Sequence, residues 1–242
     1  MRRIRGILIF IFIILLGLIF CDYQDFFKEE NKYKNVNDVI AINDKEEIKI
    51  NKINLLREYY NNDDIVGIIS IEGIKDFNYP IVQTTNNDYY LNHNYYKNYD
   101  SYGSIYADYR INIEEDRKIL IYSHSSTKKD IPFNKLELYY DEEYYNNHKY
   151  IILETKAGKV RYEIFSVFVE TNDFTYMNIN FNNSKDWYSH ILKLQKKSLY
   201  KTNVKLKSDD DILIMQTCSN NKNYKNYKNK YLLVISRRVE NE

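Results

Sequence analysis

Cys218 and His124 are the two residues of this chain whose types and positions could support covalent chemistry. Cys218 ends the apolar run 212–218 and is followed by the polar residues 219–221. His124 ends a similar run, 118–124, and is also followed by a polar loop. Each run predicts a strand whose last side chain reaches a sheet edge, where a substrate can contact it.

A thiol and an imidazole are the two parts of a common nucleophilic pair. A free thiol has a pKa of about 8.5 and is mostly protonated at neutral pH, so it needs a nearby base or cation. Imidazole can play either role. Two interpretations of Cys218 remain open at this point, a nucleophile or a buried small hydrophobe. Cys218 and His124 are far apart along the chain, and the sequence alone does not bring them together.

The N-terminal residues predict an uncleaved membrane anchor. Three arginines in residues 1–5 precede the uncharged stretch 6–21, which as a helix is about 24 Å long. Snorkelling arginines can extend this toward a hydrocarbon core of about 30 Å. Residues 18–20 are bulky, which argues against a signal-peptide cleavage site and against lipid modification of Cys21. We expect residues 1–5 in the cytoplasm and the domain that follows outside the cell, on a single-pass membrane protein.

Composition predicts one folded domain behind this anchor. Residues 22–62 are polar and end in a short amphipathic helix at 53–60, while residues 63–242 have the length of a single all-β domain. The formal net charge of +1 argues against a nucleic-acid partner. Beyond residue 21 the chain has one cysteine, so this domain cannot form an internal disulfide.

Short apolar and β-branched runs separated by turn residues predict eight strands, which favour a barrel or a sandwich. They are residues 65–71, 79–83, 104–107, 119–123, 150–154, 160–170, 212–216 and 231–236. Phe133, Leu136 and Tyr140 are spaced three to four residues apart, which predicts a helical piece that continues into residues 141–147. A longer helix is predicted at 184–200, capped by Asn183 or Ser184, with Trp187 in the core.

The remaining histidines predict no metal site and no cofactor. His93, His148 and His190 lie among polar residues or just before a strand, so we expect each at the surface or in a local hydrogen bond. No two of them have metal-ligand spacing, and no glycine-rich phosphate loop is present.

The order and spacing of several motifs resemble the class B sortases. These motifs are Tyr79-Pro80-Ile81-Val82-Gln83, Gly103-Ser104-Ile105-Tyr106-Ala107-Asp108-Tyr109-Arg110, Ile121-Tyr122-Ser123-His124, Phe133-Asn134-Lys135-Leu136 and Thr217-Cys218. The similarity extends over residues 65–236. A long helix before the run at 212 is also typical of class B members.

The resemblance implies a mainly β fold with peripheral helices, an eight-stranded sortase-type β-barrel. It also implies a transpeptidase that joins surface proteins to the cell wall of a Gram-positive bacterium. Cys218 matches the family nucleophile, which forms a thioacyl intermediate with a threonine of a C-terminal sorting signal. His124 matches the histidine that acts as general acid and base. The implied partners are surface proteins with that signal and an amine of a cell-wall peptide or lipid-linked precursor.

One departure from the family pattern concerns the arginine that normally begins the last strand and stabilises the oxyanion. Alignment of that strand places Tyr231 at the arginine position, with Lys230 just before it. Arg237 lies on the same strand face, but six residues correspond to about 20 Å. The strand register is shifted, or Lys230 substitutes, or the enzyme is weak.

Two further functions fit the same residues. A catalytically weak or degenerate sortase-fold protein could bind sorting-signal or wall peptides without turnover, given the missing arginine. A cysteine hydrolase could use the Cys218 and His124 pair with water as the acceptor. Trapping of Cys218 by a peptide-like thiol reagent separates the binder from the two enzymes.

Overall fold

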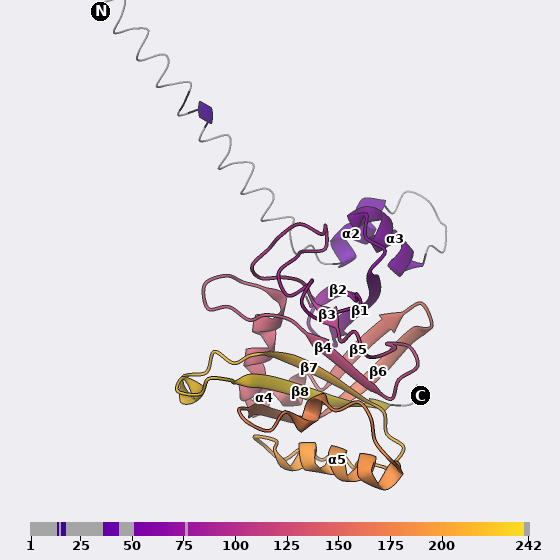
Figure 1. The fold of residues 1–242 in the computed structure, drawn as a ribbon, viewed down its shortest axis with the longest axis vertical. Helices are drawn as coiled ribbons and strands as arrows, with labels where there is room; N and C mark the ends of the chain where they lie inside the picture. The colour runs from indigo at the N-terminus through magenta and orange to yellow at the C-terminus, as the bar shows by residue number, and fades with distance from the viewer. Residues whose placement is uncertain (1–13, 15, 18–35, 44–50, 76, 240–242) are drawn as a thin grey trace, which may run out of the picture. The chain divides into compact units, whose positions relative to one another are not determined.

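The strands of the protein close into one β-barrel (Figure 1). The computed structural model describes residues 14, 16–17, 36–43, 51–75 and 77–239. Around the barrel the strand order is β1-β2-β3-β4-β7-β8-β6-β5, and the predicted eight-stranded barrel is therefore confirmed. Among the described residues no helix is both long enough and apolar enough to cross a membrane, and most of the predicted anchor, 6–21, lies outside them.

All eight predicted strands are present, with ends shifted by up to three residues. Their bounds are β1 Ile65–Ile71, β2 Asn78–Val82, β3 Tyr106–Ala107, β4 Lys118–Tyr122, β5 Tyr150–Thr155, β6 Gly158–Glu170, β7 Ile212–Cys218 and β8 Tyr231–Val239. Most neighbours pair antiparallel, but β2 pairs with β3, and β4 with β7, in parallel. Parallel pairing needs a long crossover, and the chain between β4 and β7 supplies it.

The barrel interior is filled by alternate residues of its strands, because successive strand side chains point to opposite faces. The buried core cluster includes Ile119 and Ile121 of β4, Leu213 and Met215 of β7, and Leu232 and Val234 of β8. The residues between them therefore face outward, among them Tyr122, Gln216 and Cys218. The outward-facing positions carry polar side chains near the strand ends and buried apolar ones, such as Leu120 and Ile214, between them.

The helices lie around the barrel. They are α2 Val36–Asn43, α3 Lys52–Tyr60, η1 Pro132–Tyr140, α4 Glu142–Asn147, η2 Phe174–Met177, α5 Ser184–Lys196 and η3 Lys222–Tyr224. The segment 132–140 is a 3₁₀ helix with Pro132 in its first turn. The Asn183 side chain caps α5, as predicted, by accepting hydrogen bonds from the N–H groups of Lys185 and Asp186.

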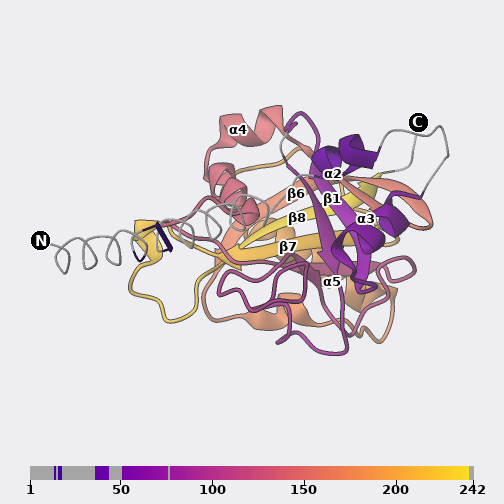
Figure 2. The same cartoon turned by 90° about the horizontal axis from the view of Figure 1, so that it is seen from above.

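Helix α5 ends at Lys196, four residues earlier than predicted, because the chain turns back to the sheet. The Leu199 N–H donates to the Val167 carbonyl of β6 at 2.7 Å, a bond that a continued helix could not make. Trp187 is fully buried, as predicted. Figure 1 shows α5 and the orange β6–β7 connection on one side of the barrel and α2 and α3 on the other; in Figure 2, seen from above, α2 and α3 lie in front of the strands.

His190, expected at the surface or in a local hydrogen bond, is instead buried and contacts a residue 72 positions away. His190 lies on the buried side of α5, where its Nε2 is 2.9 Å from the Lys118 amine. Its neighbours along the chain are polar, but the helix turns it toward Phe181, whose ring centroid is 4.8 Å away. Burial lowers the pKa of His190 to about 3, with Lys118 and other lysines contributing, so the ring is neutral at physiological pH.

Candidate active site

The parallel pairing of β4 with β7 directs His124 and Cys218 to the same edge of the barrel. Tyr122 lies opposite Gln216 in this pair, and the Ser123 N–H donates to the Gln216 carbonyl one residue further on. Two residues beyond the Tyr122–Gln216 pair, each strand reaches its chemically active side chain. Because neighbouring strands are about 4.8 Å apart, His124 and Cys218 leave the barrel side by side.

The two loops that follow these residues are bonded to each other. The Ser125 hydroxyl donates to the Cys218 carbonyl, and the Asn220 side-chain amide donates to Ser125 Oγ at 3.0 Å. Cys218 itself is exposed, so the interpretation of Cys218 as a buried small hydrophobe is wrong. The structure brings the predicted thiol and imidazole to one accessible edge.

His124 is oriented by a main-chain carbonyl of the β2–β3 loop. Its Nε2 lies 2.8 Å from the Leu91 carbonyl oxygen. A carbonyl can only accept, so Nε2 carries the proton, and in the neutral ring Nδ1 is then the basic nitrogen. Gly103 leaves room for this carbonyl. Gly103 has a φ of +58°, and a Cβ atom at this position would lie 2.5 Å from the Leu91 oxygen. Only glycine tolerates both this backbone conformation and this close approach.

Two opposite charges act on the Cys218 thiol. Although the Cys218 residue is exposed, nearby protein atoms partly desolvate its thiol and raise its pKa; the Lys230 ammonium lowers this pKa, and the Glu137 carboxylate raises it. Glu137 belongs to η1, and its Oε1 accepts the Asn220 N–H at 2.8 Å, two residues after the cysteine. Burial also raises the pKa of Glu137, while the Asn220 N–H and Lys230 oppose this. The resting site therefore favours the thiol over the thiolate.

Tyr231, and no arginine, lies across from Cys218. The antiparallel β7–β8 pair places Cys218 opposite Tyr231, and the ladder continues with the Ser219 N–H donating to the Lys230 carbonyl at 2.7 Å. Tyr231, which the sequence alignment places at the arginine position, is thus the β8 residue that pairs with Cys218. Burial raises the pKa of Tyr106 on β3, and the charges of Asp88, Asp108 and Cys218 contribute.

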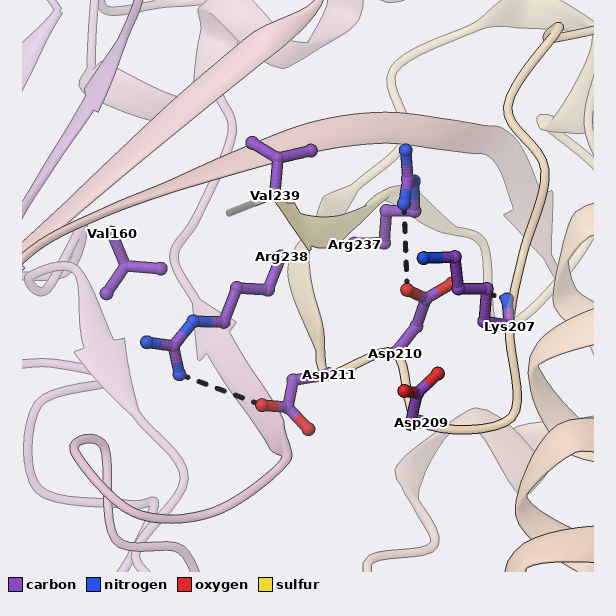
Figure 3. A pocket seen from close by; sticks show the side chains of 8 residues that line it. All are labelled: Val160, Lys207, Asp209, Asp210, Asp211, Arg237, Arg238 and Val239. Carbon is purple, nitrogen blue, oxygen red and sulfur yellow. Dashed lines mark hydrogen bonds and ion pairs between the residues drawn. The ribbon is translucent and has the colours of Figure 1, made fainter. Parts of the chain in front are cut away.

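Arg237 lies at the other end of β7 and β8, opposite Ile212. Its guanidinium bonds to Glu163 at 2.8 Å and approaches Asp210 to 3.6 Å. Arg237 lines a pocket of about 580 Å³. Figure 3 shows its ion pair with Asp210 there, beside the pair of Arg238 with Asp211. Arg237 is therefore excluded as the residue that contacts a substrate bound to Cys218.

Sequence reasoning missed several residues that shape this edge. They are Ser125, Asn220, Glu137, Tyr140 and the Leu91 carbonyl. Tyr140 contacts Ser219, with 2.6 Å between the two hydroxyl oxygens. The only sequence signal was the polar character of the loops after His124 and Cys218. A main-chain carbonyl and a glutamate on another element leave no pattern near the nucleophile.

The other histidines make local contacts. His93 Nδ1 lies 2.7 Å from the Tyr89 carbonyl, and His148 Nδ1 lies 3.0 Å from the Tyr144 carbonyl. Within the described part of the chain, no group of three or more His, Cys, Asp or Glu side chains is placed to hold a metal ion.

Comparison with known proteins decides the family. The model of the sortase domain matches residues 69–238, well over half of the chain. The chain belongs to the sortase family. Sortase B of Listeria monocytogenes is 35% identical over 165 residues, which cover 67% of this chain and 66%, just under two thirds, of that protein.

Solved structures place this sortase in class B. The X-ray structure of Clostridium perfringens sortase B superposes with a TM-score of 0.68 and 29% identity, covering 76% of this chain and 98% of that chain. A Staphylococcus aureus sortase B–substrate complex gives a TM-score of 0.69 with 26% identity, covering 79% of this chain and 86% of that chain. These matches agree with the barrel and with the class B resemblance of the motifs.

Removing either of the two charges beside the Cys218 thiol should change its reactivity, and the two removals should act in opposite directions. Glu137→Gln keeps an oxygen for the Asn220 N–H but removes a negative charge, so the pKa of Cys218 should fall. Lys230→Gln should raise it. Below the thiol pKa, the rate of iodoacetamide alkylation follows the thiolate fraction, so roughly threefold faster and slower alkylation are expected at pH 7.5.

The pH profile of alkylation, read by intact mass, measures both effects. Lys222→Gln is the matched control, since Lys222 lies in the same β7–β8 loop and should leave the profile unchanged. Identical profiles for all three variants would contradict the assignment of these charges.

Proposed function

We propose that this protein is a cysteine transpeptidase that cleaves a C-terminal sorting signal and transfers the surface protein to a cell-wall amino group. The observation that carries the proposal is the shared edge of β4 and β7, where His124 and Cys218 emerge together. Membership in the sortase family supports the reaction class. The Staphylococcus aureus relative is described in complex with a substrate, which supports a peptide-binding site of the same kind.

The reaction proceeds in two acyl transfers. The Cys218 proton passes to the basic nitrogen of His124, and the thiolate attacks the carbonyl carbon of the scissile peptide bond. His124 then gives its proton to the leaving amine as the carbon–nitrogen bond breaks, which leaves a thioester on Cys218. The acceptor amine attacks the thioester carbon and loses a proton to His124; the carbon–sulfur bond then breaks, and the proton passes from His124 to the sulfur, which restores the thiol. A thiolate suits both steps, because it attacks well and also leaves well.

We further propose that residues 6–21 anchor the protein in the membrane with its catalytic domain outside the cell. Three arginines precede this uncharged stretch, and an acidic residue follows it, which supports an N-terminus inside. A surface protein exported through the same membrane would then meet the enzyme where its sorting signal emerges.

A catalytically weak protein is the second candidate, favoured by Tyr231 at the position opposite Cys218. A tyrosine hydroxyl can donate one hydrogen bond to an oxyanion but brings no charge. Lys230 brings a charge on a flexible side chain, and neither replaces the planar guanidinium fork. The raised pKa of the Cys218 thiol points in the same direction. We expect an active enzyme with slow turnover.

Cys218→Ala should abolish cleavage, and His124→Ala should reduce it by about 100- to 10,000-fold. The substrate is a fluorogenic peptide that contains the sorting motif of a surface protein. That protein is encoded by a neighbouring gene and ends in a short motif, an apolar span and a basic tail. Both side chains lie at the barrel rim, so circular dichroism should show intact folds. Cleavage by Cys218→Ala near the wild-type rate would remove Cys218 from the mechanism.

Tyr231→Arg should raise the turnover of the same peptide, because one added oxyanion donor is worth about 100- to 1000-fold in favourable cases. Arg237→Ala should leave kcat within about twofold, although loss of its bonds to Glu163 and Asp210 should lower the unfolding temperature. Steady-state kinetics decide between these residues. An inactive Arg237→Ala variant together with a neutral Tyr231→Arg variant would refute the assigned register.

A further inference from the structure

The chain between β6 and α5, residues 171–183, forms a wall beside the proposed nucleophile; we call it the wall segment. Tyr176 from this segment is buried, and its hydroxyl donates to Gln216 Oε1 at 2.7 Å, two residues before Cys218 on the same strand face. Phe174 packs on Tyr231, with ring centroids 5.9 Å apart. The wall segment therefore covers the outer faces of β7 and β8 next to the cysteine.

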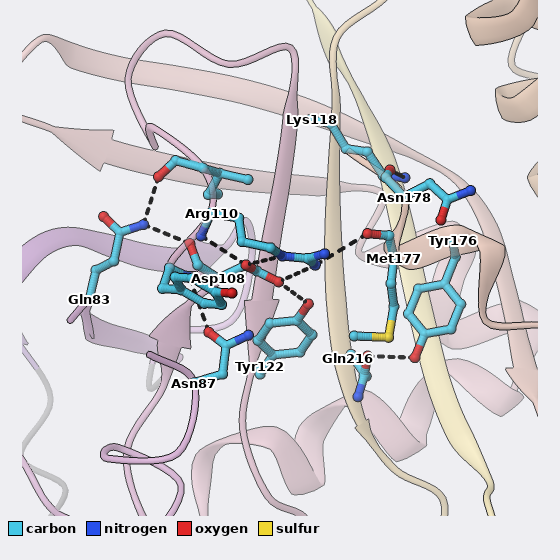
Figure 4. A network of polar contacts seen from close by, with 12 residues as sticks. Gln83, Asn87, Asp108, Arg110, Lys118, Tyr122, Tyr176, Met177, Asn178 and Gln216 are labelled. Carbon is cyan, nitrogen blue, oxygen red and sulfur yellow. Dashed lines mark hydrogen bonds and ion pairs between the residues drawn. The ribbon is translucent and has the colours of Figure 1, made fainter. Parts of the chain in front are cut away.

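Two basic side chains from other elements hold consecutive carbonyls of the wall segment. Arg110 Nη2 donates to the Met177 carbonyl at 3.2 Å, and the Lys118 amine donates to the Asn178 carbonyl at 2.6 Å. Figure 4 shows Arg110, from the β3–β4 loop, and Lys118, from β4, both directed toward the segment, alongside the Tyr176–Gln216 bond. The segment is irregular except for the short η2 helix, so these side-chain bonds supply order that a regular ladder would otherwise give.

Arg110 is itself fixed by a buried carboxylate. Asp108 is 0% exposed and accepts bonds from Arg110 Nε at 2.8 Å, from Arg110 Nη2 at 2.7 Å and from the Tyr122 hydroxyl at 2.7 Å. Burial alone would raise the pKa of Asp108, but these donors hold it below its ordinary value, so the carboxylate is charged. Tyr122 belongs to β4, two residues before His124. The same network therefore connects the strand of the histidine to the wall segment.

Lys118 has no carboxylate at ion-pair distance among the described residues. Lys118 is 2% exposed, and its amine lies close to the Asn178 carbonyl and, at 2.9 Å, to His190 Nε2. Burial lowers the pKa of Lys118 to about 7, and Arg110 contributes. A buried amine without a carboxylate partner destabilises a fold relative to an apolar side chain of the same size. A lysine at this position needs another reason, and its bond to the wall segment provides one.

We propose that Arg110 and Lys118 are positioning residues that clamp the wall segment beside Cys218 and thereby set the binding of the peptide that acylates it. This inference rests on the proposed function. The clamp acts on the Tyr176–Asn178 backbone and not on the thiol or the imidazole. Its loss should therefore weaken substrate binding while the intrinsic reactivity of Cys218 is retained.

Two variants test the clamp without leaving Asp108 unpaired. Arg110→Lys keeps a positive charge beside Asp108 but lacks the fork that holds both the carboxylate and the Met177 carbonyl. Lys118→Met is close in shape and removes the bond to Asn178. Matched controls on β6 are Arg161→Lys, whose arginine pairs with Glu72 at the surface, and Lys159→Met, whose lysine is 61% exposed.

The measurements are the KM and kcat for the sorting peptide, the alkylation rate of Cys218, and hydrogen exchange of residues 171–183 by mass spectrometry. Arg110→Lys should raise KM about 10- to 100-fold, the effect of losing one hydrogen bond from a charged donor, and Lys118→Met about 3- to 10-fold, the effect of losing one from a largely neutral amine, while kcat and alkylation stay within about threefold. Exchange in the wall segment should become faster. The two controls should match the wild type in every measurement.

An unchanged KM in both variants would overturn the proposal, whether or not exchange becomes faster. A fall in kcat and in alkylation with KM unchanged would also overturn it, since it would place these residues in the chemistry. If the wild type cleaves no sorting peptide, the proposed function fails, and hydrogen exchange still decides the clamp: faster exchange supports it, and unchanged exchange refutes it.

Discussion

The parallel pairing of β4 with β7 is the constraint on which the rest of the site depends. Two parallel strands run in the same direction, so their C-terminal ends lie at one edge, and whatever follows each strand meets there. Tyr122 opposite Gln216 sets this register. If β7 slipped by one residue against β4, the Cys218 side chain would point into the barrel interior. The His124 imidazole would then lie beside main-chain atoms and not beside the thiol. The apolar interior, with Ile119, Ile121, Leu213 and Met215, is what resists such a slip.

Polar contacts then refine the placement that the strands provide. The Leu91 carbonyl orients the imidazole, and Ser125 connects the loop after His124 to the Cys218 carbonyl. Behind this edge, Asp108 joins Arg110 and Tyr122 in a buried network that reaches the wall segment. None of these groups forms or breaks a bond to the substrate in the proposed reaction. They keep the reacting groups and the neighbouring backbone in one arrangement, which is a precondition for efficient acyl transfer.

The strands could be predicted from the sequence because short apolar runs bounded by polar loops fix their positions, as for residues 65–71 and 212–218. The pair of Cys218 and His124 could be proposed for the same reason, since each ends such a run. The side of α5 on which His190 lies, and the 3₁₀ form of η1, depend on packing between distant segments. The role of the Leu91 carbonyl depends on loop geometry, and the effect of Glu137 on the thiol is a charge interaction between residues 81 positions apart in the sequence. Neither is encoded near the residue it acts on.

The most direct test of the proposed mechanism is intact mass spectrometry of the full-length protein mixed with the sorting peptide. We expect an adduct on Cys218 whose mass equals that of the peptide fragment N-terminal to the cleaved bond, less one water, as a thioester requires. Addition of an amine acceptor should remove the adduct and yield a product that contains the amine. Cleavage without any adduct on Cys218, or with hydrolysed product alone at saturating amine, would contradict the proposed transpeptidase.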